Sequence, residues 1–353
     1  MVPFRSVMLL TKSSIKYWII FSLIGTLCLG GGGAAESLPD NPSPSGSISV
    51  LLYHPEEENF DSVFRGHLGW LKQNGYQTIS PETLVDYLAG EEVSLPPKPI
   101  LLTFDDGTIE NYEIVYPALA EFGFTGIAFV LTSPDFTSYS KRSWWKEADR
   151  SGILRIENHS YSHGLIWTSP QIVDFYSGDE GDYYLIEGID SRPGAPIYEF
   201  DYELVDDRYL PDRRIANLCV KYVTQNGGEE FFKQEGWEEE LSRVVENFRS
   251  SQKERSSYEK EQQRNSRFQK ELSRSKKIIE RTVGRGKQVM FFAYPWGAYD
   301  DELILRLKNY GYQGAFTTDG GVNFPGDDPF KIKRFVITSD MTVEDLSDIL
   351  KFE

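Results

Sequence analysis

The chain has 353 residues, enough for one large α/β domain with insertions or for one domain plus a smaller one. Acidic residues outnumber basic ones, with 54 Asp and Glu against 37 Lys and Arg. Such a surface repels nucleic acid and anionic membranes, so we exclude both as partners.

The N-terminus is typical of a secretory signal. Basic residues up to Lys16 precede an apolar run over 17–29, and small residues follow up to Ala35, where we expect cleavage. We therefore predict a signal peptide at 1–35, and a linker rich in Pro, Ser and Gly at 36–46. The alternative is an uncleaved membrane anchor. Both versions predict export to the periplasm, the cell envelope or the extracellular space.

Strands and helices alternate through most of the remaining chain. Apolar runs predict strands at 48–53, 100–104, 126–131, 153–157, 288–293, 313–317 and 332–337. Apolar faces at helical spacing and capping signals predict helices at 60–74, from Ser80-Pro81 onward, and at 111–122, 301–310 and 343–351. This alternation indicates parallel βα units arranged as a barrel within a domain over 47–353.

Residues 165–265 interrupt the alternation. The first half of this stretch is aromatic and acidic, and the chain over 229–281 is highly charged and mostly helix-forming. We predict a large insertion at about 165–265.

Two adjacent carboxylates stand where the predicted strand 100–104 ends. Asp105 and Asp106 occur in Thr103-Phe104-Asp105-Asp106-Gly107, and Gly107 permits a sharp turn. Because adjacent side chains diverge at a strand end, one carboxylate can bind a metal while the other faces the water to be activated. The alternative is an Asp-Gly turn with a capping role.

Two of the four histidines lie close together in His159-Ser160-Tyr161-Ser162-His163. On a helical turn this spacing would put both rings on one face. Asp106, His159 and His163 would then give three ligands and leave one position open, as in catalytic zinc sites. We expect a divalent metal, Zn²⁺ first, with Co²⁺ or Ni²⁺ as alternatives.

Three other residues are candidates for the same centre. His54 ends the first predicted strand and is the best candidate if a third histidine must act as general acid; its alternative is a core or surface position. Trp296, in Tyr294-Pro295-Trp296-Gly297, could offer a backbone N–H to an oxyanion and a flat face to a sugar; the alternative is a turn with packed aromatics. Arg334 could orient Asp105 and lower its pKa, unless it is an ordinary surface residue; Arg192 is a rival.

These motifs make the chain resemble the polysaccharide deacetylase family, carbohydrate esterase family 4, also called the NodB homology domain. The aspartate motif matches the family's first motif and the histidine motif its second. The stretch 291–299 resembles the third motif of the branch that deacetylates poly-N-acetylglucosamine in biofilms. The resemblance covers roughly 47–163 and 266–350.

The resemblance implies a distorted (β/α) barrel and metal-dependent hydrolysis of N-acetyl groups on an amino-sugar polymer. It implies that Asp105 is the base and that Asp106, His159 and His163 bind the metal. The chain lacks the family's usual late Leu-x-His. In the biofilm branch the acid is a histidine on the first strand, and His54 fits that position.

A second departure is Ala293, which replaces the arginine of the usual third motif and leaves the partner of Asp105 open. The substrate is open as well, because peptidoglycan, chitin oligomers, a galactosamine polymer or O-acetyl groups would suit the same chemistry. The alternative from another class is a non-catalytic carbohydrate-binding protein on the same fold, although such a protein has no need of a metal site with a spare base.

Overall fold

The computed structural model describes residues 46–134, 142–178, 181–284 and 286–351. The predicted signal peptide, and the predicted linker apart from Gly46, lie outside these residues. The described residues form two compact units. The larger lies within Pro42–Gln171, Tyr198–Asp212 and Glu254–Glu353, and the smaller within Ile172–Ile197 and Arg213–Lys253. Within the described part of the chain, no helix has the length and apolar character to cross a membrane.

The larger unit is built on a parallel sheet. Seven strands follow the order β11-β10-β5-β4-β3-β1-β12, and β2 pairs with β3 beside this path. Their bounds are Ser49–Tyr53 (β1), Gln77–Thr78 (β2), Pro99–Phe104 (β3), Gly126–Val130 (β4), Leu154–Asn158 (β5), Phe291–Ala293 (β10), Gly314–Phe316 (β11) and Phe335–Ile337 (β12). A parallel bridge between Phe316 and Ile332 joins β11 to the segment that enters β12, so the two ends of the path meet. The predicted distorted (β/α) barrel is confirmed.

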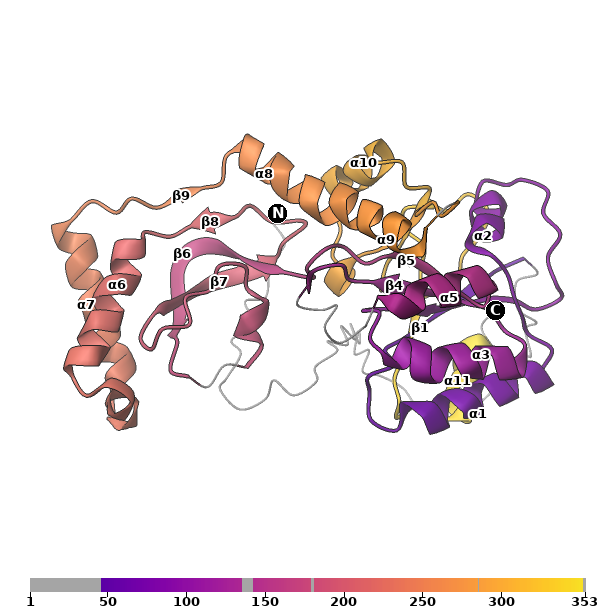
Figure 1. The fold of residues 1–353 in the computed structure, drawn as a ribbon, viewed down its shortest axis with the longest axis horizontal. Coiled ribbons are helices and arrows are strands. Elements are labelled where there is room, and N and C mark those ends of the chain that lie inside the picture. The colour runs from indigo at the N-terminus through magenta and orange to yellow at the C-terminus, as the bar shows by residue number, and fades with distance from the viewer. Residues whose placement is uncertain (1–45, 135–141, 179–180, 285, 352–353) are drawn as a thin grey trace, which may run out of the picture. The chain divides into compact units, whose positions relative to one another are not determined.

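Helices connect the strands of the larger unit. They are Phe60–Gln73 (α1), Pro81–Leu88 (α2), Tyr116–Phe122 (α3), Ser143–Ser151 (α5), Glu261–Phe268 (α8), Ser275–Val283 (α9), Asp301–Asn309 (α10) and Val343–Leu350 (α11). Two π-helical turns, Asn111–Val115 (η1) and Gln269–Arg274 (η4), lead into α3 and α9, and a 3₁₀ turn, Pro295–Gly297 (η5), follows β10. Helices α1, α3 and α11 lie side by side (Figure 1). The sequence did not predict α5.

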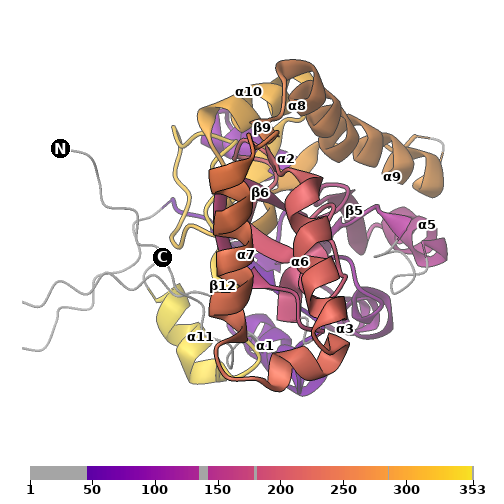
Figure 2. The same ribbon diagram turned by 90° about the vertical axis from the view of Figure 1, so that its left-hand side faces the viewer.

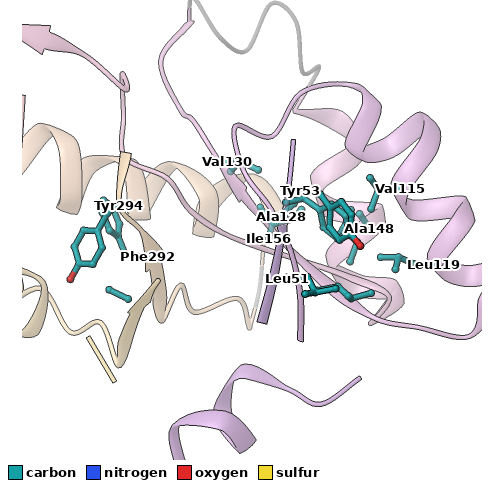
Figure 3. Packing of buried hydrophobic residues seen from close by; sticks show 14 of the residues in the cluster. Leu51, Tyr53, Val115, Leu119, Ala128, Val130, Ala148, Ile156, Phe292 and Tyr294 are labelled. Atoms are coloured by element: carbon teal, nitrogen blue, oxygen red, sulfur yellow. The ribbon is translucent and has the colours of Figure 1, made fainter. Parts of the chain in front are cut away.

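Alternate strand residues build two apolar layers, because successive side chains of a strand point to opposite faces. Leu51 and Tyr53 of β1 face the helices, in a cluster that includes Leu119 of α3 and Ala148 of α5 (Figure 3). The intervening Val50 belongs to a second cluster, whose other strand residues include Leu101, Ile127, Phe129, Phe291 and Phe316. This second cluster fills the barrel interior, and the strand ends above it are left for polar side chains.

The smaller unit contains two helices, Arg213–Gln225 (α6) and Trp237–Ser251 (α7), which lie side by side (Figure 2). A 3₁₀ turn, Gly228–Lys233 (η3), connects them. They enclose a separate apolar core made of Phe175, Ile215, Cys219, Val223, Phe231, Trp237, Leu241, Val245 and Phe248. The α7 residues in this core, Trp237, Leu241, Val245 and Phe248, form the buried face of that helix.

Short strands and turns complete the structure. Leu165–Phe175 (β6) and Pro196–Tyr202 (β7) form a two-stranded sheet, and Tyr209–Leu210 (β8) pairs antiparallel with Ser257–Tyr258 (β9). A 3₁₀ turn spans Gly181–Leu185 (η2). The predicted insertion at 165–265 includes the described smaller unit and parts of the larger one, so its limits stay a prediction.

Candidate active site

The predicted site residues gather at one end of the barrel. They follow the carboxyl ends of four parallel strands: His54 after β1, Asp105 and Asp106 after β3, His159 after β5, and Trp296 after β10. The carboxyl ends of parallel barrel strands lie at the same face, which is where barrel enzymes place their chemistry. Tyr53 and Phe104 are level in the register, so the next residues, His54 and Asp105, leave neighbouring strands at the same height.

A tight turn after β3 separates the two aspartates. Asp106 has a φ of 67° and Gly107 a φ of 67°, so both adopt the left-handed conformation. The Asp105 carboxylate is buried at 4% exposure, whereas that of Asp106 is 25% exposed. A left-handed aspartate costs energy and is typical of functional sites.

Gly107→Ala should destabilise the protein by more than the cost of placing an alanine in the left-handed conformation. A Cβ atom at Gly107 would lie 2.5 Å from Cγ1 and 2.8 Å from the Cα atom of Val130, so backbone would have to move. Gly75→Ala is the matched control, because Gly75 has a φ of 78° and open space around it. We expect the control to cost about 1–2 kcal/mol and Gly107→Ala about 1–3 kcal/mol more, measured by urea unfolding. Equal losses would contradict the close contact with Val130.

Asp106, His159 and His163 form a cluster whose ligand atoms all lie within 4.8 Å of one another. Asp106 Oδ1 is 3.5 Å from His159 Nε2 and 3.8 Å from His163 Nε2. Burial lowers the pKa of both histidines to about 4, so the rings are neutral near pH 7. Neutral imidazole and carboxylate are the forms that bind divalent metals, so the donor set fits a metal ion.

The orientation of His159 supports the same conclusion. Its Nδ1 lies 2.9 Å from the backbone carbonyl oxygen of Ala293, so Nδ1–H donates there. The lone pair of Nε2 is then free to face Asp106, which is the usual arrangement of a metal-binding histidine. The Ala293 position that lacks the family's arginine thus contributes its carbonyl oxygen to the site.

The helical turn predicted for the histidine motif is wrong. Ser160 has a φ of 78° and His163 a φ of 52°, so the motif is a turn with two left-handed residues. The two rings still meet, with centroids 4.9 Å apart. Two buried glutamates that the sequence analysis missed, Glu203 and Glu271, contact this turn through Ser162.

Arg334, and not Arg192, lies against Asp105. Its Nη1 and Nη2 donate to Asp105 Oδ1 and Oδ2 at 2.8 and 2.9 Å, and its Nε donates to the carbonyl of Thr317 at 2.7 Å. Burial by itself would raise the pKa of Asp105, but the Arg334 guanidinium outweighs it and lowers that pKa to about 2. Arg334 is fully buried, whereas the side chain of Arg192 is 51% exposed and pairs with Asp190. Asp105 is therefore ionised and held in a fixed orientation.

His54 lies near both aspartates. Burial would lower its pKa, but the carboxylates of Asp106 and Glu56 outweigh this and raise it above 6.5. Its Nδ1 is buried and has no hydrogen-bond partner among the described residues. His54 therefore lies beside the aspartates with a ring nitrogen that no described residue engages.

Trp296 adopts a left-handed conformation in η5, with a φ of 62°. Its ring lies 4.5 Å from the ring of His163 and is stacked on Tyr202 at 5.9 Å, measured between centroids. The side chain is 41% exposed. The indole therefore presents an exposed aromatic surface beside the cluster of Asp106, His159 and His163.

The family model for polysaccharide deacetylases matches residues 92–175 and 246–315, which include both motifs and Trp296. Over these two stretches, the chain matches the polysaccharide deacetylase family. The domains that this model describes are polysaccharide deacetylases, which is the catalytic class expected from the motifs.

Two curated relatives match parts of this chain. The Bacillus subtilis protein YxkH, named as a polysaccharide deacetylase, is 30% identical over 127 residues, which are 33% of this chain and 43% of the relative. The Escherichia coli poly-beta-1,6-N-acetyl-D-glucosamine N-deacetylase is 33% identical over 94 residues, which are 24% of this chain and 14% of that protein. The chain thus spans less than half the length of either relative.

Solved structures agree with the deacetylase fold. The BpsB deacetylase domain from Bordetella bronchiseptica superposes with a TM-score of 0.56 at 19% identity, covering 84% of this chain and 98% of that one. IcaB from Ammonifex degensii gives a TM-score of 0.51 at 20% identity, covering 88% and 100%. At 19% and 20% sequence identity, this structural similarity supports the assignment of the fold alone.

Proposed function

We propose that this protein hydrolyses N-acetyl groups on an amino-sugar polysaccharide of the poly-N-acetylglucosamine type. One observation carries the proposal. A His₂Asp cluster suited to a divalent metal lies beside a separate, ionised carboxylate, Asp105, that Arg334 holds in place. A carbohydrate-binding protein would need neither the metal ligands nor a spare base.

Asp106, His159 and His163 would hold the ion, with Zn²⁺ first and Co²⁺ or Ni²⁺ as alternatives. Such an ion supplies Lewis-acid chemistry, since it polarises a carbonyl and makes water acidic near pH 7. The Ala293 carbonyl fixes the ring of His159 and so keeps Nε2 of that ring directed at Asp106.

Asp105 would act as general base. Arg334 contacts both of its oxygens, yet Oδ2 also lies 4.0 Å from His159 Nε2 and thus faces the metal ligands. A carboxylate oxygen has two lone pairs, so Oδ2 can accept a proton from the attacking water while it accepts the hydrogen bond of Arg334.

His54 would act as general acid toward the leaving amine. It stands level with Asp105 on the neighbouring strand, and nearby carboxylates favour its protonated form. Trp296 would provide a stacking surface for a sugar ring, and its backbone N–H would face the developing oxyanion.

The choice of polymer rests on resemblance. The Escherichia coli relative acts on poly-beta-1,6-N-acetyl-D-glucosamine according to its name, and the 291–299 stretch resembles the corresponding branch. We propose an exported protein that acts on such a polymer in the envelope, with residues 1–35 as its signal and polysaccharide export machinery as a partner.

The test measures acetate release from poly-N-acetylglucosamine oligomers with and without added Zn²⁺, Co²⁺ or Ni²⁺. The wild type and the His54→Ala variant are assayed in parallel. We expect metal-dependent release, and a fall of kcat in the variant by roughly 10²–10⁴-fold. Unchanged release by His54→Ala would exclude it as the acid. Release only from peptidoglycan, chitin oligomers, a galactosamine polymer or an O-acetylated glycan would keep the chemistry and change the substrate. No release from any of these would favour the non-catalytic carbohydrate-binding alternative.

A further inference from the structure

The turn that carries the two histidines needs support from outside itself. Ser160 and His163 are both left-handed without being glycine, with φ values of 78° and 52°. Such residues persist where surrounding contacts hold them. The positions of both metal-ligating rings therefore depend on whatever fixes the segment between them.

Glu271, in η4, provides much of that support. Its Oε2 accepts hydrogen bonds from the backbone N–H groups of Tyr161 and Ser162, each at 3.0 Å. Its Oε1 accepts one from the Ser162 hydroxyl, also at 3.0 Å. Glu271 is 1% exposed, and Lys270 Nζ lies 3.2 Å from Oε1. One buried carboxylate thus holds three donors of the histidine turn.

The same π-helical turn also holds the ring of Tyr161. The charged groups of Lys270 and Arg274 lie over that ring, at 4.9 and 5.2 Å from its centroid. The Tyr161 carbonyl accepts hydrogen bonds from the N–H groups of Thr132 and Ser133, at 3.2 and 2.7 Å. Single π-turns inside helices occur frequently at functional sites, and here the π-turn carries the residues that contact the histidine turn.

A second glutamate reaches the turn from another segment. Glu203 is 2% exposed, and its Oε2 accepts from the Ser162 hydroxyl at 2.8 Å. Its neighbour Tyr202 stacks on Trp296. Both lie between the two stretches that the family model matches, whereas Glu271 lies within the second. Two consecutive residues of this segment therefore contact both loops of the candidate site.

We propose that Glu271 is a positioning residue of the metal centre, assisted by Glu203 through the Ser162 hydroxyl. The inference rests on the proposed function only in taking the Asp106, His159 and His163 cluster as the metal site. Loss of the Glu271 carboxylate leaves two backbone N–H groups without an acceptor, and the turn relaxes. His159 and His163 then lose their fixed separation, and the affinity for the metal falls.

The experiment measures Zn²⁺ affinity of the full chain by competition with a chromogenic chelator, without substrate. We expect Glu271→Met to bind Zn²⁺ roughly 10–100-fold more weakly, the range found when residues that orient metal ligands are lost. Glu271→Gln should stay within about threefold of the wild type, because its side-chain carbonyl can still accept from both N–H groups.

Asp149→Leu is the matched control. Asp149 Oδ1 accepts from the N–H of Ile156 at 2.9 Å and from Lys287 Nζ at 2.7 Å, so this variant also removes a carboxylate that anchors backbone. It lies before β5 rather than at the site. It should lower the midpoint of thermal unfolding and leave the affinity for Zn²⁺ unchanged.

Wild-type affinity in Glu271→Met, with a lowered midpoint of unfolding like that of Asp149→Leu, would overturn the proposal. If Glu271→Met does not fold, Glu271→Asp decides, because its shorter side chain keeps the charge but withdraws the carboxylate from the N–H groups of Tyr161 and Ser162. Severalfold weaker binding supports the proposal, and unchanged binding overturns it. A wild-type protein that binds Zn²⁺ but releases no acetate would contradict the proposed function and leave this inference intact.

Discussion

Asp105→Asn should lower kcat/KM for acetate release by roughly 10²–10⁴-fold while the protein still binds its metal. The amide is nearly the same size as the carboxylate but cannot accept a proton from water. Metal binding should survive, because the cluster of ligand atoms consists of Asp106, His159 and His163 and does not include Asp105.

The measurement pairs steady-state acetate release with the zinc content of the same sample. Asp106→Asn is the control, since it removes a ligand from the cluster and should lower both the zinc content and the activity. An Asp105→Asn variant that kept wild-type kcat would contradict the base assignment. One that lost its zinc would place Asp105 among the ligands.

Arg334→Met should destabilise the protein by about 3–5 kcal/mol, because it leaves the buried Asp105 carboxylate without its counter-ion. Arg334 is fully buried, so solvent does not screen this pair. Arg334→Lys should recover only part of the loss, since a single ammonium cannot reproduce the two parallel hydrogen bonds to Oδ1 and Oδ2. Urea unfolding in the presence of a chelator measures the change without a contribution from bound metal.

The double variant Asp105→Asn/Arg334→Met tests whether the loss of stability comes from the ion pair between Asp105 and Arg334. Removing both charges leaves no uncompensated ion, so the double variant should unfold at a higher urea concentration than Arg334→Met alone. Additive losses would show that Arg334 stabilises the protein through its other contacts, such as the hydrogen bond to the Thr317 carbonyl.

The barrel was predictable because its signals are local. Each strand is a short apolar run, and helix starts such as Ser80-Pro81 carry the cap that the structure shows, with Ser80 accepting from the N–H of Thr83. Helix α5 was missed, since its mean hydropathy is low and its buried residues are two adjacent tryptophans and Ala148 rather than a long apolar stripe.

The sequence predicted that the candidate site residues lie close together, but it did not predict their detailed geometry. The spacing predicted that His159 and His163 lie close together, but it predicted a helical turn as the cause. A four-residue interval fits a helix and also fits the turn with left-handed residues that the structure shows. Nothing in the local sequence ranks Arg334 above Arg192, since the choice depends on a contact 229 residues away from Asp105. Glu203 and Glu271 were missed for the same reason, because their partner Ser162 is distant in the chain.

The contact between Arg334 and Asp105 also bears on the order of events as the chain folds. The ligand cluster Asp106, His159 and His163 and its supports Glu271 and Ala293 all precede Arg334 in the chain, and Arg334 arrives only with the segment that brings the two ends of the sheet together. A partly assembled barrel could therefore capture a metal ion while its carboxylate lacked the charge that holds it. Under the proposed function, hydrolytic competence would then appear late, when the last strand docks.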